Sequence, residues 1–263
     1  MNLTLDQMKE IELEILTAVD RLCREEGIAY YLAFGTLLGA VRHGGFIPWD
    51  DDVDILMPRE DYDRFIQVAS KLPGHLHFKY CGNTHPYIYD FGKVEDGRTL
   101  LIEDTYRYLG IDSGVYIDIF PLDGCPRTGL GRRVHLYHVR FWQELLSMYF
   151  ADPDKPRSAW KRPIVRFVKR WLSQDRIYAH IEKICRKFPI DRSKFVGYHE
   201  GRLNELMPRD TFGAPRDMRF EGRDFLAPEQ PEAYLARVYG HWRQLPPEDQ
   251  RVAHQHSVVR YRH

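Results

Sequence analysis

The sequence feature that most constrains the fold is an acidic run set between apolar residues. Residues 46–57 read FIPWDDDVDILM. These flanks are too apolar for a solvated acidic loop, so we expect a buried strand whose side chains alternate between two faces. Asp50, Asp52 and Asp54 then share one face, where their charges repel one another unless a cation neutralises them. Carboxylate oxygens are the ligands that Mg²⁺ and Mn²⁺ prefer, so the run predicts a divalent metal site.

A further acid occupies a similar apolar setting. Residues 115–120 read VYIDIF, with Asp118 as the acid. A lone carboxylate in an apolar strand is costly unless it is paired or bound to a metal. If this strand lies beside the one that carries Asp52 and Asp54, three carboxylates converge on one or two ions, as in enzymes of phosphoryl displacement. The alternative for Asp118 is an internal salt bridge to an arginine.

A turn suited to phosphate binding precedes the acidic run. Residues 28–34 are expected to form a strand and residues 37–42 a short helix, with Gly35 and Thr36 between them. Glycine lets the backbone approach a ligand, and a helix N-terminus with a neighbouring hydroxyl offers hydrogen bonds to phosphate oxygens. Most Gly-Thr pairs are simple turns, but an Asp-x-Asp strand shortly afterwards makes this pair a stronger signal.

The remaining patterns predict a sheet-rich first half and a helical second half. Thr4 and Gln7 have the spacing of a capping box, and apolar residues at steps of three or four predict a helix from there to Gly27. Further helices are expected over 59–72, 132–150, 159–172, 173–188 and 231–239. Further strands are expected over 75–81, 87–95, 98–103, 114–120, 195–198 and 220–225.

The Gly-Thr turn, the Asp-x-Asp strand and the third acid together resemble the nucleotidyltransferase superfamily. Residues 34–55, FGTLLGAVRHGGFIPWDDDVDI, resemble more specifically the signature of the LicD family. Later blocks agree in the expected order, at 91–94 (FGKV), 116–123 (YIDIFPLD), 220–222 (FEG) and 239–247. The resemblance implies an α+β fold: a nucleotidyltransferase-like mixed β-sheet core flanked by helices, with a mainly helical, basic C-terminal half. We expect the catalytic core at 1–125 and a helical and irregular family-specific region, packed on it, at 126–263.

The residues alone predict a metal-dependent phosphoryl-transfer site, and the family resemblance implies a more specific activity. That activity is transfer of phosphocholine from CDP-choline to a sugar hydroxyl of a surface glycan, such as teichoic acid, lipopolysaccharide or capsule. One alternative is transfer of ribitol phosphate, glycerol phosphate or a nucleotidyl group on the same fold. Another is a non-catalytic module of glycan assembly, which would have no reason to keep three mutually repelling acids.

The family resemblance assigns the catalytic and metal-binding roles to the acidic residues. Asp52, Asp54 and Asp118 are predicted to be catalytic and to bind Mg²⁺ or Mn²⁺, with Asp50 as an auxiliary ligand. Asp118 is also expected to deprotonate or orient the acceptor hydroxyl as a general base.

Other residues are predicted to bind the donor. Two would cradle a phosphate and two would neutralise charge on the transferred group and the leaving CMP: Gly35, Thr36, Arg42 and Lys93. If the donor is CDP-choline, its trimethylammonium group needs an aromatic wall. The candidates near enough in sequence are Trp49, Tyr87, Tyr89 and Tyr116, although each taken singly is more often a core residue.

Charge is balanced over the chain but not along it. The 38 basic and 38 acidic residues cancel, which gives no reason to expect a nucleic-acid partner. Residues 1–120 hold 11 basic and 21 acidic residues, a net charge of −10, so residues 121–263 carry +10. Seven cations and no acid lie within 155–172, among aromatic and aliphatic residues at helical spacing. This segment is predicted either to lie on an anionic membrane surface or to be a solvated basic face over an ordinary core.

Several absences narrow the context further. The four cysteines lack zinc or disulfide spacing and are expected to be reduced and mostly buried. No signal peptide is recognisable, so we expect a cytoplasmic protein, with contact at the inner face of the membrane as the further expectation. The sequence has no Walker A and no GxGxxG motif, and neither His135/His138 nor His254/His256 is assigned to a metal.

Overall fold

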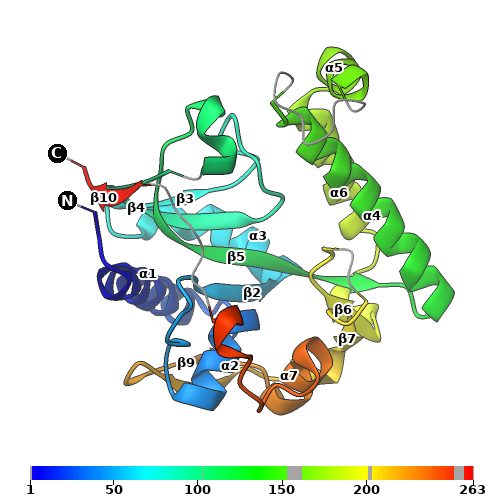
Figure 1. Ribbon diagram of the computed structural model, residues 1–263. Coiled ribbons are helices and arrows are strands. Elements are labelled where there is room, and N and C mark those ends of the chain that lie inside the picture. Colours follow the sequence, from blue (N-terminus) through cyan, green and yellow to red (C-terminus); the bar gives the residue numbers. More distant parts are fainter. Residues whose placement is uncertain (1, 103, 153–161, 201–202, 252–257, 263) are drawn as a thin grey trace.

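The computed structural model describes residues 2–102, 104–152, 162–200, 203–251 and 258–262 (Figure 1). Its helices are α1 (Leu5–Glu26), α2 (Phe34–His43), α3 (Arg59–Val68), α4 (Gly129–Tyr149), α5 (Arg162–Trp171), α6 (Gln174–Cys185) and α7 (Pro231–Tyr239). Its strands are β1 (Tyr31–Leu32), β2 (Asp54–Pro58), β3 (Leu76–Lys79), β4 (Gly92–Ile102), β5 (Ser113–Cys125), β6 (Phe195–Gly197), β7 (Met207–Pro208), β8 (Arg216–Phe220), β9 (Arg223–Ala227) and β10 (Val258–Tyr261).

A mixed sheet forms the centre of the molecule. Its main path is β1-β2-β5-β4-β10; β3 pairs with β4, and β6 links β5 to β7. The β2–β5 pair is parallel and the other pairs are antiparallel. The predicted α+β fold with a mixed sheet is therefore confirmed. Strands from beyond residue 125 join this sheet through β6 and β10, and the division into domains at that residue stays a prediction.

Helix α1 forms as its sequence predicts. The Thr4 hydroxyl accepts a hydrogen bond from the Gln7 amide at 3.2 Å, and the Gln7 side chain accepts one from the Thr4 amide at 2.9 Å, which completes the capping box. Gly27 ends the helix with φ of 61°, a conformation that favours glycine. The buried apolar face of α1 packs on β5 and β4, so this helix closes one part of the main core.

Several predicted boundaries were wrong, and one shift concerns the acidic run. The strand begins only at Asp54, because residues 47–50 turn, with the Asp50 amide bonded to the Ile47 carbonyl at 3.0 Å. Asp50 and Asp52 therefore lie in the loop that enters the strand. Helix α2 starts at Phe34 and takes Gly35 and Thr36 into its first turn.

Two other strand predictions also needed correction. The two strands expected over 87–95 and 98–103 are one long strand, β4, with a register irregularity between Asp96 and Leu101. The strand expected over 220–225 is a hairpin instead, because Glu221 and Gly222 adopt φ values of 48° and 75° and turn the chain.

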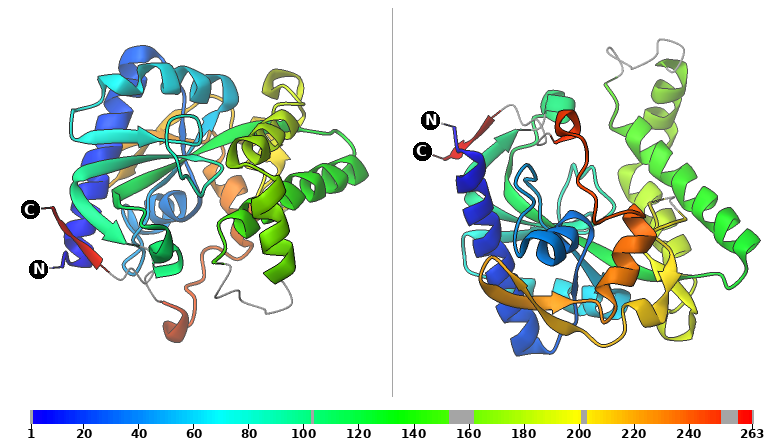
Figure 2. Two further views of the ribbon diagram at one scale, coloured as in Figure 1. Left: turned by 90° about the horizontal axis from the view of Figure 1, so that it is seen from above. Right: turned by 60° about the horizontal axis from the view of Figure 1, so that its bottom comes forward.

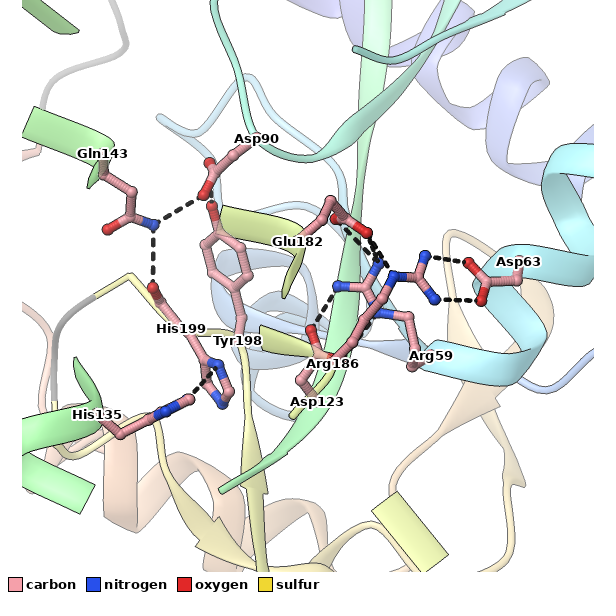
Figure 3. A network of polar contacts seen from close by, with 10 residues as sticks. All are labelled: Arg59, Asp63, Asp90, Asp123, His135, Gln143, Glu182, Arg186, Tyr198 and His199. Atoms are coloured by element: carbon pink, nitrogen blue, oxygen red, sulfur yellow. Dashed lines mark hydrogen bonds and ion pairs between the residues drawn. The ribbon is translucent and has the colours of Figure 1, made fainter. Parts of the chain in front are cut away.

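Helices α4, α5 and α6 form an arm that projects from the sheet (Figures 1 and 2). A separate apolar cluster, including Val139 of α4 and Ile177 of α6, holds its long helices together. At the base of the arm, Arg59 of α3 donates to both carboxylate oxygens of Asp123 on β5, at 2.8 and 2.5 Å, and to Glu182 of α6 at 3.2 Å (Figure 3). Arg59 therefore joins α3 to the sheet through a buried ion pair with Asp123 and to the arm through a partly buried one with Glu182.

Candidate active site

The parallel pairing of β2 with β5 places two predicted acids side by side. Asp54 is directly opposite Asp118 in the register of the two strands. The Asp118 amide donates to the Val53 carbonyl at 2.8 Å, and the Asp54 amide donates to the Thr36 hydroxyl at 2.8 Å. Backbone and side-chain hydrogen bonds thus fix both carboxylates at one place on the sheet, as expected if the two acidic segments are neighbours.

The other two acids of the run reach the same place from the loop. A Cβ atom added to Gly35 would lie 2.7 Å from an Asp50 carboxylate oxygen and 3.7 Å from one of Asp52. Any side chain at position 35 would therefore clash with Asp50. The glycine lets the first turn of α2 approach the acids closely, and its predicted contact with a donor phosphate stays a prediction.

These residues line an open cavity of about 590 Å³. Its acidic lining comprises Asp50, Asp52, Asp54, Asp118, Glu200 and Glu205. Its aromatic lining comprises Phe34, Phe91, Phe120, Tyr198 and Tyr239, and the remaining residues are Gly35, Asn204 and Val238. No lysine or arginine lines this cavity in the part of the chain that the structure describes.

The electrostatics of the cavity fit a divalent cation. Burial first, and then the charges of Asp52, Asp118 and Asp50, raise the pKa of Asp54 well above its usual range. Removing water from a carboxylate among other carboxylates disfavours its charged form. A bound cation removes this cost, and carboxylate oxygens are the donors that Mg²⁺ and Mn²⁺ accept. The residues present therefore fit the predicted metal.

Lys93 lies beside the acids but not in the cavity lining. Its register partner on β5 is Asp118, and its ammonium nitrogen is 3.2 Å from an Asp118 carboxylate oxygen. The same nitrogen lies 3.3 Å from the ring centre of Tyr116 and 3.9 Å from that of Tyr89, and the residue is 2% exposed. Lys93 thus forms a buried ion pair with Asp118, and its predicted contact with the donor stays a prediction.

Two further donor-binding candidates have structural partners. The Thr36 hydroxyl accepts the Asp54 amide, as described above, and Thr36 is 3% exposed. The Arg42 guanidinium donates to the Trp242 carbonyl at 3.1 Å, on the segment after α7. Of the four donor-binding candidates, only Gly35 lines the cavity.

The aromatic residues considered for a choline wall are likewise placed elsewhere. Tyr89 and Tyr116 enclose the Lys93 ammonium, so the cation that these rings contact belongs to the protein itself. The Tyr87 hydroxyl donates to the Phe91 carbonyl at 2.9 Å, and Trp49 packs against His43. None of the four lines the cavity.

Sequence reasoning missed two acids near the loop that carries Asp50 and Asp52. Glu12 is buried on α1, where burial and then the charges of Asp52, Asp51 and Asp50 raise its pKa. Glu12 lies four residues after Met8 and four before Leu16, so it falls on the apolar face of α1. This spacing could have indicated from the sequence that Glu12 is buried. Glu221, at the tip of the β8–β9 hairpin, accepts the Phe46 amide at 2.9 Å.

The missed acids in the cavity itself, Glu200 and Glu205, come from the segment after β6. No motif or periodicity in the sequence connects this segment to the acidic run. Only the pairing of β6 with the end of β5 brings it there.

A separate buried cluster lies at the base of the arm. Possible ligand atoms of Asp123, Cys185 and His199 lie within 4.8 Å of one another. Both Asp123 oxygens already accept hydrogen bonds from Arg59, and a His199 ring nitrogen lies 3.2 Å from one of His135. The four cysteines are free, and three of them are buried, as expected.

Comparison with known proteins supports the resemblance seen in the sequence. Residues 27–130 match the family model described as LicD/FKTN/FKRP, nucleotidyltransferase domain. The chain is 28% identical over 266 residues to the lipopolysaccharide cholinephosphotransferase LicD of Haemophilus influenzae, with 96% of each chain covered. It is 57% identical over 50 residues to the human ribitol 5-phosphate transferase FKRP, a match that spans 19% of this chain and 10% of that protein. The predicted relationship to the LicD family is confirmed.

Proposed function

We propose that this chain, whose residues 27–130 match the family model described as LicD/FKTN/FKRP, nucleotidyltransferase domain, transfers phosphocholine from CDP-choline to a sugar hydroxyl of a surface glycan. The observation that carries the proposal is the register pairing of Asp54 with Asp118 in an open cavity that Asp50 and Asp52 also line. The near full-length similarity to a cholinephosphotransferase supports the choice of transferred group.

Asp52, Asp54 and Asp118 would hold Mg²⁺ or Mn²⁺, with Asp50 as an auxiliary ligand. When bound, such an ion supplies positive charge to the phosphate oxygens of the donor. Gly35 lines the cavity, and the lack of a side chain lets the first turn of α2 lie close to Asp50, so we propose its backbone as a contact for a donor phosphate.

Asp118 would act as the general base. It lines the cavity, and one of its carboxylate oxygens lies 3.2 Å from the Lys93 ammonium nitrogen. In the transfer step, the acceptor hydroxyl oxygen forms a bond to the phosphorus that carries choline. The bond from that phosphorus to the bridging oxygen breaks, CMP leaves with the electron pair, and the hydroxyl proton passes to Asp118.

Ribitol phosphate is the second candidate for the transferred group, since the 50-residue similarity to FKRP is high. The test is to incubate the purified chain with Mg²⁺ and CDP-choline, CDP-ribitol or CDP-glycerol, together with a panel of glycans. We expect release of CMP and a glycan whose mass rises by one phosphocholine group, both abolished by a chelator. Failure to release CMP from any donor would contradict the enzyme and favour a non-catalytic assembly module.

We further propose a cytoplasmic site of action at the inner face of the membrane, with α5 as the contact. Phe167 and Trp171 are 63% and 66% exposed, beside the exposed cations Arg166, Lys169 and Arg170. Exposed aromatic rings on a cationic helix suit an anionic lipid surface. No described helix combines the length and apolar character needed to cross a bilayer. The part of the predicted basic segment at 155–161 lies outside the described residues.

Charge reversal tests this contact. Each cation near an anionic surface contributes about 1 kcal/mol, so changing Arg166, Lys169 and Arg170 to Glu should release the protein from acidic liposomes in a sedimentation assay. The matched control reverses three arginines on other elements: Arg21, Arg192 and Arg216. Equal release by both triple variants would contradict a specific role for α5, and so would a wild-type protein that does not sediment with the liposomes at physiological salt.

A further inference from the structure

A second cavity lies on the arm, where residues of both α4 and α6 line it. Its volume is about 780 Å³, which is in the range of sites that hold small ligands. Leu130 and Val134 of α4 contribute to its apolar lining. Ile184 of α6 and Phe188 complete this apolar lining, and Lys183 and Lys187 line the cavity as well. We call this site the arm cavity.

The arm cavity is continuous with an exposed apolar stripe on α4. The stripe consists of Leu130, Val134, Tyr137 and Phe141, each of which is more than half exposed. Their spacing of four, three and four residues places them on one face of the helix. Leu130 and Val134 belong to both the stripe and the lining of the arm cavity. Contiguous exposed apolar residues commonly mark a surface that binds a lipid or another protein.

The charge at the arm cavity is positive. Lys183 and Lys187 are both exposed and lie four residues apart, at the end of α6 and just after it. The neighbouring acid, Glu182, is directed to Arg59 at 3.2 Å and to Arg186 at 2.6 Å (Figure 3). Within the described part of the chain, no aspartate or glutamate lines this cavity. The two lysines therefore suit the anionic group of a ligand.

We propose that the arm cavity binds one anionic phospholipid molecule. An acyl chain would lie against the apolar lining and the stripe, and the phosphate would lie beside Lys183 and Lys187, whose ammonium groups can donate charge-assisted hydrogen bonds to it. A phospholipid carries both kinds of group, so it matches an apolar site with cations at one side. The positive charge favours an anionic lipid over a zwitterionic one.

A lipid is favoured over an acidic protein segment by the rest of the arm. Helix α5 packs on α4, and its exposed rings and cations have the same combination of apolar and basic groups. The inference goes beyond the membrane contact proposed for α5, because it concerns a single lipid molecule held by α4 and α6. It does not depend on the transferase activity.

Calorimetric titration with a short-chain lipid tests the site. The probe is dihexanoyl phosphatidylglycerol below its critical micelle concentration, added to the full chain in metal-free buffer. No bilayer surface exists under these conditions, so binding reports on a site for one molecule. We expect saturable binding that weakens with salt. Glycerol 3-phosphate, which lacks acyl chains, and zwitterionic dihexanoyl phosphatidylethanolamine should each bind at least about 10-fold more weakly.

Variants locate the site on the arm. Changing Lys183 and Lys187 together to Gln should weaken binding of the probe by about 10-fold or more, as expected for two cations at an anionic head group. Val134→Ser should weaken it several-fold through the lost apolar contact. All three residues are exposed, so the fold should be kept. The matched controls, Lys194→Gln and Leu245→Ser, change exposed residues outside the arm cavity and should leave binding unchanged.

The outcomes separate this inference from the other proposals. The variant with three reversed charges on α5 should still bind the probe, because those residues do not line the arm cavity. Absence of probe binding, or equal binding of glycerol 3-phosphate or phosphatidylethanolamine, would overturn the lipid site, and so would an acidic amphipathic peptide that binds where the lipid does not. Unchanged binding by the lysine and valine variants would overturn the assignment to these residues. Release of CMP is measured separately, so none of these results bears on the transferase.

Discussion

Two buried carboxylates on neighbouring strands, Asp54 and Asp123, have opposite electrostatic surroundings. Asp54 is surrounded by other acids, and its pKa is raised by burial and by the charges of those acids. For Asp123 burial also favours the neutral form, but the Arg59 guanidinium outweighs it and holds the pKa below its usual range. The protein thus supplies a cation to one carboxylate and leaves the other in need of one. Asp123 thus belongs to a structural ion pair, whereas Asp54 belongs to a site suited to binding a metal ion and a charged substrate.

The largest expected effect comes from neutralising Asp54. Asp54→Asn should abolish phosphotransfer, because it removes a metal ligand at the centre of the cavity. In metal-free buffer the variant should be as stable as the wild type or more stable, since it relieves repulsion among the acids. Asp52→Asn should behave alike. CMP release and urea unfolding measure the two properties, and activity within a few-fold of wild type would contradict the metal site.

The same substitution at Asp123 should have the opposite effect. Asp123→Asn leaves Arg59 buried with half of its carboxylate partners, and breaking a buried ion pair typically costs about 3–5 kcal/mol. Urea unfolding should show this loss, while turnover per folded molecule should stay within a few-fold of wild type. A stable but inactive Asp123→Asn variant would place this residue in the catalytic site and remove the contrast.

The two regions should also respond oppositely to acid. Burial lowers the pKa of both His135 and His199 to about 4, which keeps these rings neutral, and Arg59 lowers the pKa of Asp123 and keeps its carboxylate charged. All three groups are thus held deprotonated, so the unfolded chain binds more protons than this region does. Its contribution to stability should be lost as pH falls from the ordinary histidine range toward 4. Asp54 has a raised pKa, so in metal-free protein its charged form destabilises the folded state. This destabilisation should disappear as pH falls toward the ordinary carboxyl range, where Asp54 becomes protonated.

Unfolding free energies of the wild type, Asp54→Asn and His135→Asn as a function of pH separate these contributions. His135→Asn should flatten the loss of stability between pH 6.5 and 4. Asp54→Asn should remove the improvement at low pH. If both variants kept the wild-type profile, the contrast between the regions would not be electrostatic.

The smallest effect is expected from the residue that positions Asp54. Thr36→Val keeps the shape of the side chain but removes the acceptor of the Asp54 amide, which should cost about 1 kcal/mol of stability. A several-fold fall in kcat with little change in KM for the donor would show that Thr36 acts by positioning. A large rise in KM would instead show that Thr36 contacts the donor, as the sequence predicts.

The sequence predicts the acid cluster well because its chemistry is local. Asp54 and Asp118 each lie among apolar residues typical of strands, and the parallel register of β2 with β5 meets the condition that these strands be neighbours. The expected alternation of Asp50, Asp52 and Asp54 along one strand was wrong, because Asp50 and Asp52 precede β2. The exact start of β2 was not predictable, since the turn at 47–50 depends on a backbone hydrogen bond and on α1, whose Lys9 donates to the Ile47 carbonyl at 3.1 Å.

The rest of the cavity could not be predicted for a different reason. Glu200, Glu205 and Tyr239 are far from the acidic run in sequence, and only long-range strand pairing and the return of α7 bring them together. The partners of Lys93 and Arg42 were equally hidden, because a cation close in sequence to acids can turn toward a carboxylate, an aromatic ring or a carbonyl.

The most direct test of the central claim is calorimetric titration of Mg²⁺ into the protein, with and without CDP-choline and without an acceptor. We expect weak binding to the free protein and clearly tighter binding in the presence of the donor, because Mg²⁺ is usually held by a few carboxylates together with substrate phosphates. Asp54→Asn should lose both. Equally tight Mg²⁺ binding with and without CDP-choline would indicate a structural ion, and unchanged binding by Asp54→Asn would contradict the assignment of the site.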